Sequence, residues 1–262
     1  MDEKVIRLSI SLGLLVLFAI IESLIPRKKR TLPRLKRWWT NLSMVAIDTA
    51  LLRLIFPGAA AGFAILMTQN NLGLFNIVKL PITLEIILGV IILDFSIWLQ
   101  HVISHKFKIL WKLHRVHHAD PDLDVTSGNR FHPLEILFSM LYKYFWIFLI
   151  GPSVGAVVIF EVILNGLALF NHANISLPLG IDRILRLIIV TPEMHRIHHS
   201  VIPSEHHSNF GFNLSIWDRI FKTYTDKSQL PQEDMKIGLN EFSEPNENST
   251  LWGALLIPFS KK

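Results

Sequence analysis

Long apolar runs separated by short polar segments dominate the first two thirds of the chain. The run at residues 5–25 is 21 residues long, and a helix of about 20 residues crosses the hydrocarbon layer of a membrane. Further apolar runs cover residues 43–68, 82–100 and 134–170. No stretch of any length alternates with the two-residue period of a β-strand. The pattern therefore predicts an all-α fold, a multi-pass membrane helical bundle.

Two of these runs contain residues that interrupt a helix. Pro57-Gly58 should kink the second run or turn it back, and Arg53 has to face protein or extend to the membrane surface. Gly151-Pro152 breaks the last run into a helical hairpin, either spanning or re-entrant. The final residues 251–259 are apolar but too short to span, so we expect them at the membrane interface.

The pattern divides the chain into three parts. We expect membrane spans with a basic loop in residues 1–100, a histidine-rich region with the hairpin in residues 101–225, and a polar tail with a short interfacial segment in residues 226–262.

Charge and composition support a membrane protein. The chain is 50% apolar and 18% charged, whereas soluble domains carry about a quarter charged residues. Seven of the 26 basic residues lie in residues 27–37, which contain no acid. This basic stretch follows the first run, so the run reads as a retained span and not as a signal peptide, and apolar flanks argue against nucleic-acid binding. The excess of basic residues predicts a cytoplasmic side for the stretch and, three spans later, for the histidine-rich region.

The histidines are the candidate chemistry. The chain has no cysteine, which excludes disulfides and thiolate metal sites, and all 12 histidines fall between positions 101 and 207. Eight of them form one H-x3-H motif and two H-x2-H-H motifs: His101, His105, His114, His117, His118, His195, His198 and His199. Positions i, i+3 and i+4 share a helical face, so we expect the imidazoles of each motif to converge on one centre. Eight imidazoles exceed the needs of one metal ion and suit two.

Other polar residues align with these motifs at helical spacing. Asp94 precedes His101 by two turns, and Glu161 and Asn165 align with His172, which is a candidate ninth ligand. We expect Asp94 and Glu161, with Asn165 and Asn171, to orient imidazole N–H groups, the alternative for each acid being a buried pair with an arginine. His132 could be a further ligand or a wall of the site. His206 and His207 lie in a polar segment and are expected to be solvated.

The motifs resemble those of the fatty acid hydroxylase / sterol desaturase family. The matching stretches are HVISH (101–105), LHRVHHAD (113–120), RFHPLE (130–135), FNHANI (170–175), TPEMHRIHHS (191–200) and SNFGFNLSIWDRIFKTY (208–224). The resemblance implies a helical membrane enzyme with a cytosol-facing di-iron centre. It also implies the eight motif histidines and His172 as ligands, and O₂ as the co-substrate that hydroxylates or desaturates a sterol, fatty acyl or related lipid.

The chain departs from the family pattern at two positions. Val102 stands where the family often has arginine, and Lys222 stands where glycine is usual, which can alter the turn that closes the site. No electron-transfer domain is recognisable, so we expect a separate donor of the cytochrome b5, ferredoxin or reductase type, and the short chain favours a bacterial inner membrane.

Two other functions compete with the oxygenase. A membrane zinc hydrolase would need an H-E-x-x-H helix, but Glu193 lies two residues before His195 and outside that pattern. A metal-transporting or metal-binding membrane protein would place ligands along its spans, whereas most histidines here follow the ends of the apolar runs.

Overall fold

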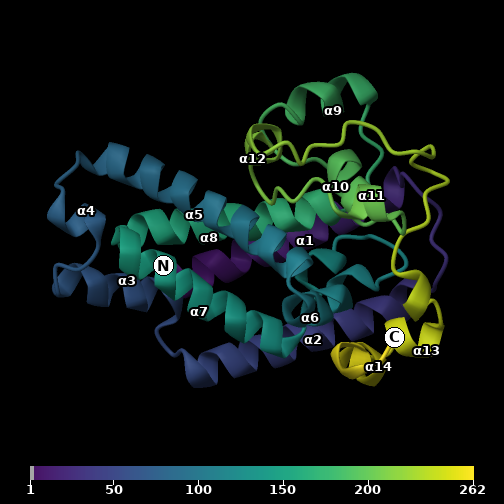
Figure 1. Ribbon diagram of the computed structural model, residues 1–262, viewed down its shortest axis with the longest axis horizontal. Helices are drawn as coiled ribbons and strands as arrows, with labels where there is room; N and C mark the ends of the chain where they lie inside the picture. Colours follow the sequence, from purple (N-terminus) through teal and green to yellow (C-terminus); the bar gives the residue numbers. More distant parts are fainter. Residues whose placement is uncertain (1–2) are drawn as a thin grey trace.

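The computed structural model describes the backbone of residues 3–262 and the side chains from residue 7 onward. Long helices form an elongated bundle, and short helices and loops gather at one end of it (Figure 1). The long part consists of α1 (Glu3–Leu24), α2 (Arg34–Ile55), α3 (Ala59–Gln69), α4 (Leu74–Ile77), α5 (Ile82–Lys106), α7 (Pro133–Ile150) and α8 (Val154–His172). Within the described residues the β-structure is limited to isolated bridges, so the all-α prediction is confirmed.

Five segments of the described chain are long and apolar enough to cross a membrane. They are Arg7–Leu24, Arg34–Ile77, Ile82–Lys106, Pro133–Ile150 and Val154–His172. Many large apolar side chains on these helices remain exposed, as expected for helices that face lipid instead of a protein interior. The multi-pass membrane architecture is therefore confirmed.

The predicted interruptions lie where the helices end. The run at 43–68 becomes two helices, α2 and α3, separated at Phe56–Gly58. Arg53 is exposed in the last turn of α2, so it extends outward and does not pack against protein. The hairpin of α7 and α8 turns at Gly151, whose φ of 64° is left-handed. A Cβ on Gly151 would lie 2.6 Å from Leu72 O, so this turn requires glycine.

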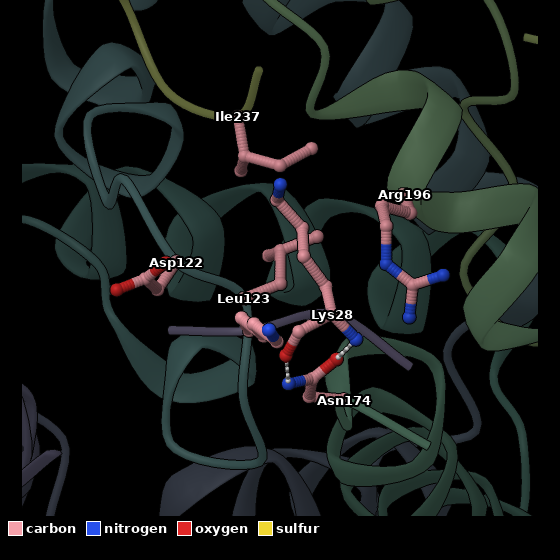
Figure 2. Close-up of a pocket in the computed structure, with 7 residues that line it drawn as sticks. Lys28, Asp122, Leu123, Asn174, Arg196 and Ile237 are labelled. Atoms are coloured by element: carbon pink, nitrogen blue, oxygen red, sulfur yellow. Dashed lines mark hydrogen bonds between the residues drawn. The ribbon is translucent and has the colours of Figure 1, made fainter. Parts of the chain in front are cut away.

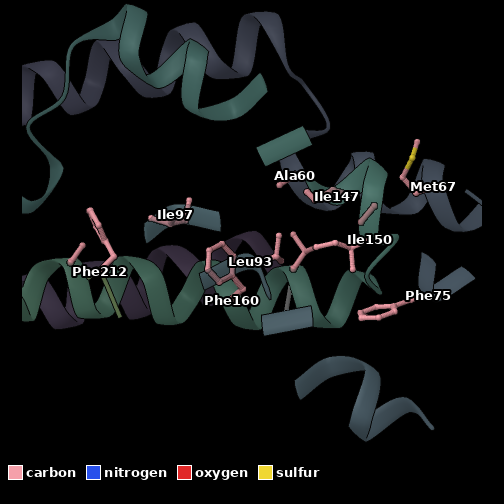
Figure 3. Packing of buried hydrophobic residues seen from close by; sticks show 12 residues of the cluster. Ala60, Met67, Phe75, Leu93, Ile97, Ile147, Ile150, Phe160 and Phe212 are labelled. Atoms are coloured by element: carbon pink, nitrogen blue, oxygen red, sulfur yellow. The ribbon is translucent and has the colours of Figure 1, made fainter. Parts of the chain in front are cut away.

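The apolar core runs along the middle of the bundle (Figure 3). Leu93 and Ile97 of α5 and Ile147 of α7 lie in one cluster with Phe160 of α8. Phe212, from the second half of the chain, joins the same cluster. The core of the membrane bundle therefore continues into the region that carries the histidines.

The short helices that gather at one end of the bundle form the second part of the fold. They are α6 (Lys108–His118), η1 (Ser127–Asn129), α9 (Leu179–Leu185), α10 (Pro192–His198), α11 (Pro203–His206), α12 (Ile216–Ile220), η2 (Asn240–Phe242), α13 (Pro245–Asn248), α14 (Leu251–Leu256) and η3 (Ile257–Phe259). Of the last three, α14 exposes Trp252, and η3 exposes Phe259. The interfacial position expected for residues 251–259 stays a prediction.

The basic stretch 27–37 lies against this histidine-bearing end. Arg27 pairs with Glu193 at 2.6 Å, and the backbone of Lys28 exchanges two hydrogen bonds with the side chain of Asn174 (Figure 2). Arg37 is completely buried and pairs with Asp120 and Asp124. The stretch is therefore more than a flank of the membrane, because several of its arginines hold the two halves of the fold together.

Candidate metal centre

Nine histidines meet in two adjoining groups at the end of the bundle. In each group the candidate ligand atoms lie within 4.8 Å of one another, and every member is buried. The imidazoles of His118 and His199, one from each group, have ring centroids 4.5 Å apart. The first group is His101, His105, His114, His118 and His198, and the second is His117, His172, His195 and His199.

The two H-x2-H-H motifs each contribute to both groups. His114 and His118 belong to the first group and His117 to the second, whereas His195 and His199 belong to the second and His198 to the first. The expectation that each motif converges on one centre is therefore wrong for these two motifs, whereas His101 and His105 of the H-x3-H motif do share the first group. Positions i and i+4 point in similar directions, but i+3 and i+4 differ by about 100° around the helix axis. Each motif thus lies between the two groups and presents ligands to both.

Backbone and side-chain acceptors fix the imidazoles of the first group. The Nδ1 atoms of His101 and His198 donate to the carbonyl oxygens of Phe210 (2.8 Å) and Ser208 (2.7 Å). The Nδ1 atom of His114 lies 2.6 Å from Glu135 Oε1. A carbonyl oxygen only accepts, so Nδ1 carries the proton and Nε2 keeps its lone pair. The Nε2 atoms of all three are buried and have no hydrogen-bond partner among the described residues.

The second group has the spacing of ligands around one ion. His172 Nε2 lies 3.1 Å from His117 Nε2 and 3.0 Å from His195 Nε2, and His195 and His199 are 3.2 Å apart at the same atoms. His172 Nδ1 donates to Ala168 O, so its Nε2 presents a lone pair to its neighbours. Two imidazoles on one ion at metal–nitrogen distances of about 2.0–2.1 Å have nitrogens roughly 3 Å apart. The donor set and its spacing therefore fit a metal ion.

Burial keeps these imidazoles neutral. It lowers the pKa of His114 to about 3, and it lowers the pKa of His118 and His199 well below the ordinary value, with neighbouring histidines adding to the effect. Neutral imidazole is the form that binds iron, zinc, copper or nickel. The arrangement thus offers nine neutral imidazoles in two groups, each of which could hold a metal ion.

Comparison with known proteins places the chain in a family. The sequence model for fatty acid hydroxylases matches residues 86–223, which include all nine of these histidines. The chain belongs to the fatty acid hydroxylase family. The family resemblance read from the histidine motifs is thereby confirmed.

Individual relatives of this family member are lipid-modifying enzymes by name. The chain is 29% identical to the ornithine lipid hydroxylase OlsE of Rhizobium tropici, over 60% of this chain and 46% of that protein. It is 32% identical to the alkylglycerol monooxygenase of Xenopus tropicalis and 30% identical to that of Homo sapiens, in each case over 57% of this chain and 32% of the relative. The chain therefore spans less than half the length of these curated relatives. No solved structure matches it significantly.

The two acids expected beside the imidazoles have other partners in this member of the family. Asp94 accepts a hydrogen bond from Trp217 Nε1 at 2.7 Å. Glu161 forms ion pairs with Arg7 and Lys143, which is the arginine-paired alternative left open by the sequence. Neither carboxylate contacts an imidazole in the described part of the chain, so their proposed role in orienting imidazoles is replaced by pairing elsewhere.

The remaining sequence candidates lie at varied distances from the centre. Asn165 is exposed on α8, and Asn171 is buried and donates to Phe212 O at 2.9 Å. His132 caps the start of α7, accepting from Leu134 N, and belongs to neither group. Of these three, only Asn171 bears on the site, because it holds Phe212 beside His172 and His195.

The expectation that both His206 and His207 are solvated is wrong for His206. His206 is 6% exposed and packs its ring 4.7 Å from Trp111 and 4.8 Å from His118. His207 is exposed, as expected. The polar sequence around them gave no sign of the packing by Trp111, which lies on α6.

Two supporting residues were missed by reasoning from spacing. Glu135 contacts His114, and Asp218 accepts from Phe210 N and Gly211 N, next to the carbonyl that holds His101. Both stand in stretches that match the family, RFHPLE and SNFGFNLSIWDRIFKTY. That family signal was available, but their function as supports depends on contacts that the sequence does not display.

Proposed function

We propose that this protein is a membrane-bound lipid hydroxylase that uses O₂ and holds two iron ions on its nine clustered histidines. The observation that carries the proposal is the pair of buried imidazole groups, five and four, at the end of an apolar bundle. When bound, a reduced iron pair supplies the electrons that activate O₂ for attack on an aliphatic C–H bond.

The surroundings of the histidines suit an apolar substrate. Phe131 stacks on the ring of His117 with centroids 4.7 Å apart and planes 9° apart. Phe212, part of the bundle core, lies 5.8 Å from the ring of His101. These aromatic side chains exclude water from the side of the centre that faces the core. We propose that a lipid chain approaches from the bilayer along this side.

The names of the relatives support a proposal for the reaction and the substrate class. Their names describe hydroxylation of an ornithine lipid and monooxygenation of alkylglycerols, so we propose hydroxylation, and not desaturation, of a polar lipid with a long alkyl chain. The printed chain has no cysteine for an iron–sulfur cluster, so we propose that a separate protein supplies the electrons.

The zinc-hydrolase alternative lacks an available general base beside the second motif. Glu193 is engaged by Arg27 at 2.6 Å and faces Arg196 at 3.6 Å. A catalytic zinc usually keeps only three protein ligands, whereas each group here offers at least four nitrogens. The histidines also form closed groups at one end and not a path along the spans, which disfavours metal transport.

Metal analysis of the purified protein tests the centre. We expect two iron ions per chain in the wild type. His198→Ala and His117→Ala each remove one ligand from a different group, so each variant should lose iron and activity. Ser204→Ala, an exposed change on α11, is the matched control and should keep both ions. One tightly bound zinc ion per chain in place of iron would overturn the proposal.

Lipid mass spectrometry of cells with and without the protein tests the reaction. A lipid that gains one oxygen atom in cells with the wild type, but not with His117→Ala, is the expected result. A lipid that instead loses two hydrogen atoms would show desaturation and contradict the proposed hydroxylation.

A further inference from the structure

We propose that His207, His206 and His105 form a loading site through which a divalent metal ion passes from water to the buried centre. The inference rests on the proposed metal centre but is independent of which lipid is oxidised.

The nine candidate ligands are closed off from solvent. His105 is the most exposed of them at 7%, and six of them are 0% exposed. A hydrated ion has to exchange water for protein ligands before it reaches such a site, because removing a bare charge from water is very costly. Some solvent-facing group must therefore provide the first protein ligand.

His207 is such a solvent-facing ligand, and the imidazoles of His206 and His105 lie next to it on the way to the buried centre. The ligand atoms of His105, His206 and His207 lie within 4.8 Å of one another. Ring centroids are 4.8 Å apart from His207 to His206 and 5.2 Å apart from His206 to His105. His207 is exposed, whereas His206 and His105 are both buried. Both ring nitrogens of His105 lack a hydrogen-bond partner in the part of the chain that the structure describes.

His105 is a member of both the loading site and the first metal group. If its imidazole binds an ion in the first group, the outer site keeps only His206 and His207. The outer site is therefore complete only while the inner site is empty. A shared ligand of this kind favours transfer of the ion inward over storage at the surface.

The segment that carries the two outer histidines is held in place. Ser208 N donates to Glu205 O, and Glu205 in turn accepts from the backbone of Gln229. The carbonyl of Ser208 accepts from His198 Nδ1, so the same turn supports a candidate ligand of the first group. Trp111 packs 4.7 Å from His206 and 4.9 Å from His105 and forms an apolar wall beside the site. The position of His207 relative to the centre is thus fixed by the fold.

The test measures how fast metal enters and leaves. Metal-free protein in detergent micelles is mixed with Fe²⁺ without oxygen, samples are stopped with a chelator, and bound iron is counted over time. Capture at the surface makes the later steps intramolecular, so we expect His207→Ala to load about tenfold more slowly. The final content should remain two iron ions, because His207 is not a ligand in the loaded centre.

Removal of metal provides the second measurement. A substitution that affects only the path of the ion slows both iron loading and removal of iron by a chelator by the same factor. It leaves the affinity of the buried centre for iron unchanged. His206→Gln should behave like His207→Ala, and Ser204→Ala on the same short helix should load at the wild-type rate.

Two results would overturn the loading site. One is wild-type loading and removal rates in both histidine variants. The other is a lower final iron content in His207→Ala, which would make His207 a permanent ligand. A wild type that binds no iron would instead refute the metal centre itself, so the two failures are distinguishable.

Discussion

At the scale of single residues, the second nitrogen of each imidazole decides how the first one is presented. His101, His198 and His172 each donate Nδ1–H to a backbone carbonyl, and His114 turns Nδ1 to a carboxylate. Such partners fix the tautomer and the ring orientation of a metal ligand. The residues that position these acceptors therefore belong to the site, even though they are not candidate ligands.

Asp218 is the clearest of these positioning residues. Its carboxylate accepts from Phe210 N, Gly211 N, Trp98 Nε1 and Thr223 Oγ1, and Phe210 O accepts from His101. In Asp218→Asn an NH₂ group must face one set of these donors. We expect about 10- to 100-fold weaker metal binding, measured by competition with a chelator. The exposed Asp226→Asn is the control, and a lower melting temperature with full affinity would reduce Asp218 to a structural role.

Lys222, which stands where the family usually has glycine, has a backbone conformation that favours glycine. Its φ is 59°, in the left-handed region, which costs an L-residue roughly 1–2 kcal/mol. The lysine therefore makes this turn a strained one, and the alteration of the turn considered from the sequence stays a prediction. Lys222→Gly should raise the free energy of unfolding by about 1 kcal/mol, read as a higher melting temperature. Lys227→Gly, at an exposed position without a positive φ, should give no such gain.

At the scale of elements, α2 does more than span the membrane. Its first turns carry Arg37, which is buried against the segment that follows α6. The guanidinium pairs with Asp120 and Asp124 and also donates to the carbonyl of Asp122 and the hydroxyl of Ser127. The segment between His118 and α7 is thereby fixed to the membrane bundle, and His114, His117 and His118 are fixed with it.

Replacing Arg37 tests this connection. In Arg37→Met the buried carboxylates of Asp120 and Asp124 lose their counter-charge, and breaking a buried pair in this way costs about 3–5 kcal/mol. We expect a correspondingly lower free energy of unfolding in detergent micelles. The neighbouring Lys36 is exposed, so Lys36→Met should change stability by no more than about 0.5 kcal/mol. If both substitutions lowered the free energy of unfolding equally, the buried ion pairs of Arg37 would not stabilise the fold as proposed.

At the scale of the whole molecule, the basic stretch and the histidines lie at one end of the bundle (Figure 1). The positive-inside rule predicts that the basic stretch lies on the cytoplasmic side of the membrane. Because the histidines lie at the same end of the bundle, the same prediction applies to them. The loop between α3 and α4 lies at the opposite end of the bundle.

Single cysteine labels test this orientation without interference, because the chain has no cysteine of its own. Ser204 on α11 and Asn70 at the end of α3 are both exposed. A membrane-impermeant thiol reagent added to intact cells should label Asn70→Cys and leave Ser204→Cys unreacted until the cells are opened. The reverse pattern would place the histidines on the outer side.

The parts of this protein that depend on local geometry could be predicted from its sequence. A long run of apolar residues is most stable in the hydrocarbon layer of the membrane, so the spans could be predicted. The breaks at Pro57-Gly58 and Gly151-Pro152 follow from the backbone properties of proline and glycine. The clustering of nine histidines likewise follows from helical spacing and the resemblance to the family, because i, i+3 and i+4 are neighbours in any helix.

Tertiary structure alone decided which partners these residues take. A buried acid needs a partner, but its sequence neighbours do not name it: Asp94 meets Trp217, and Glu161 meets Arg7. Packing against Trp111 buries His206, although its own segment is polar. The division of the histidines into five and four depends on how α5, α6, α8 and α10 are placed around one another. Contacts between residues far apart in the chain are chosen by the packing of whole helices, and no local pattern encodes that choice.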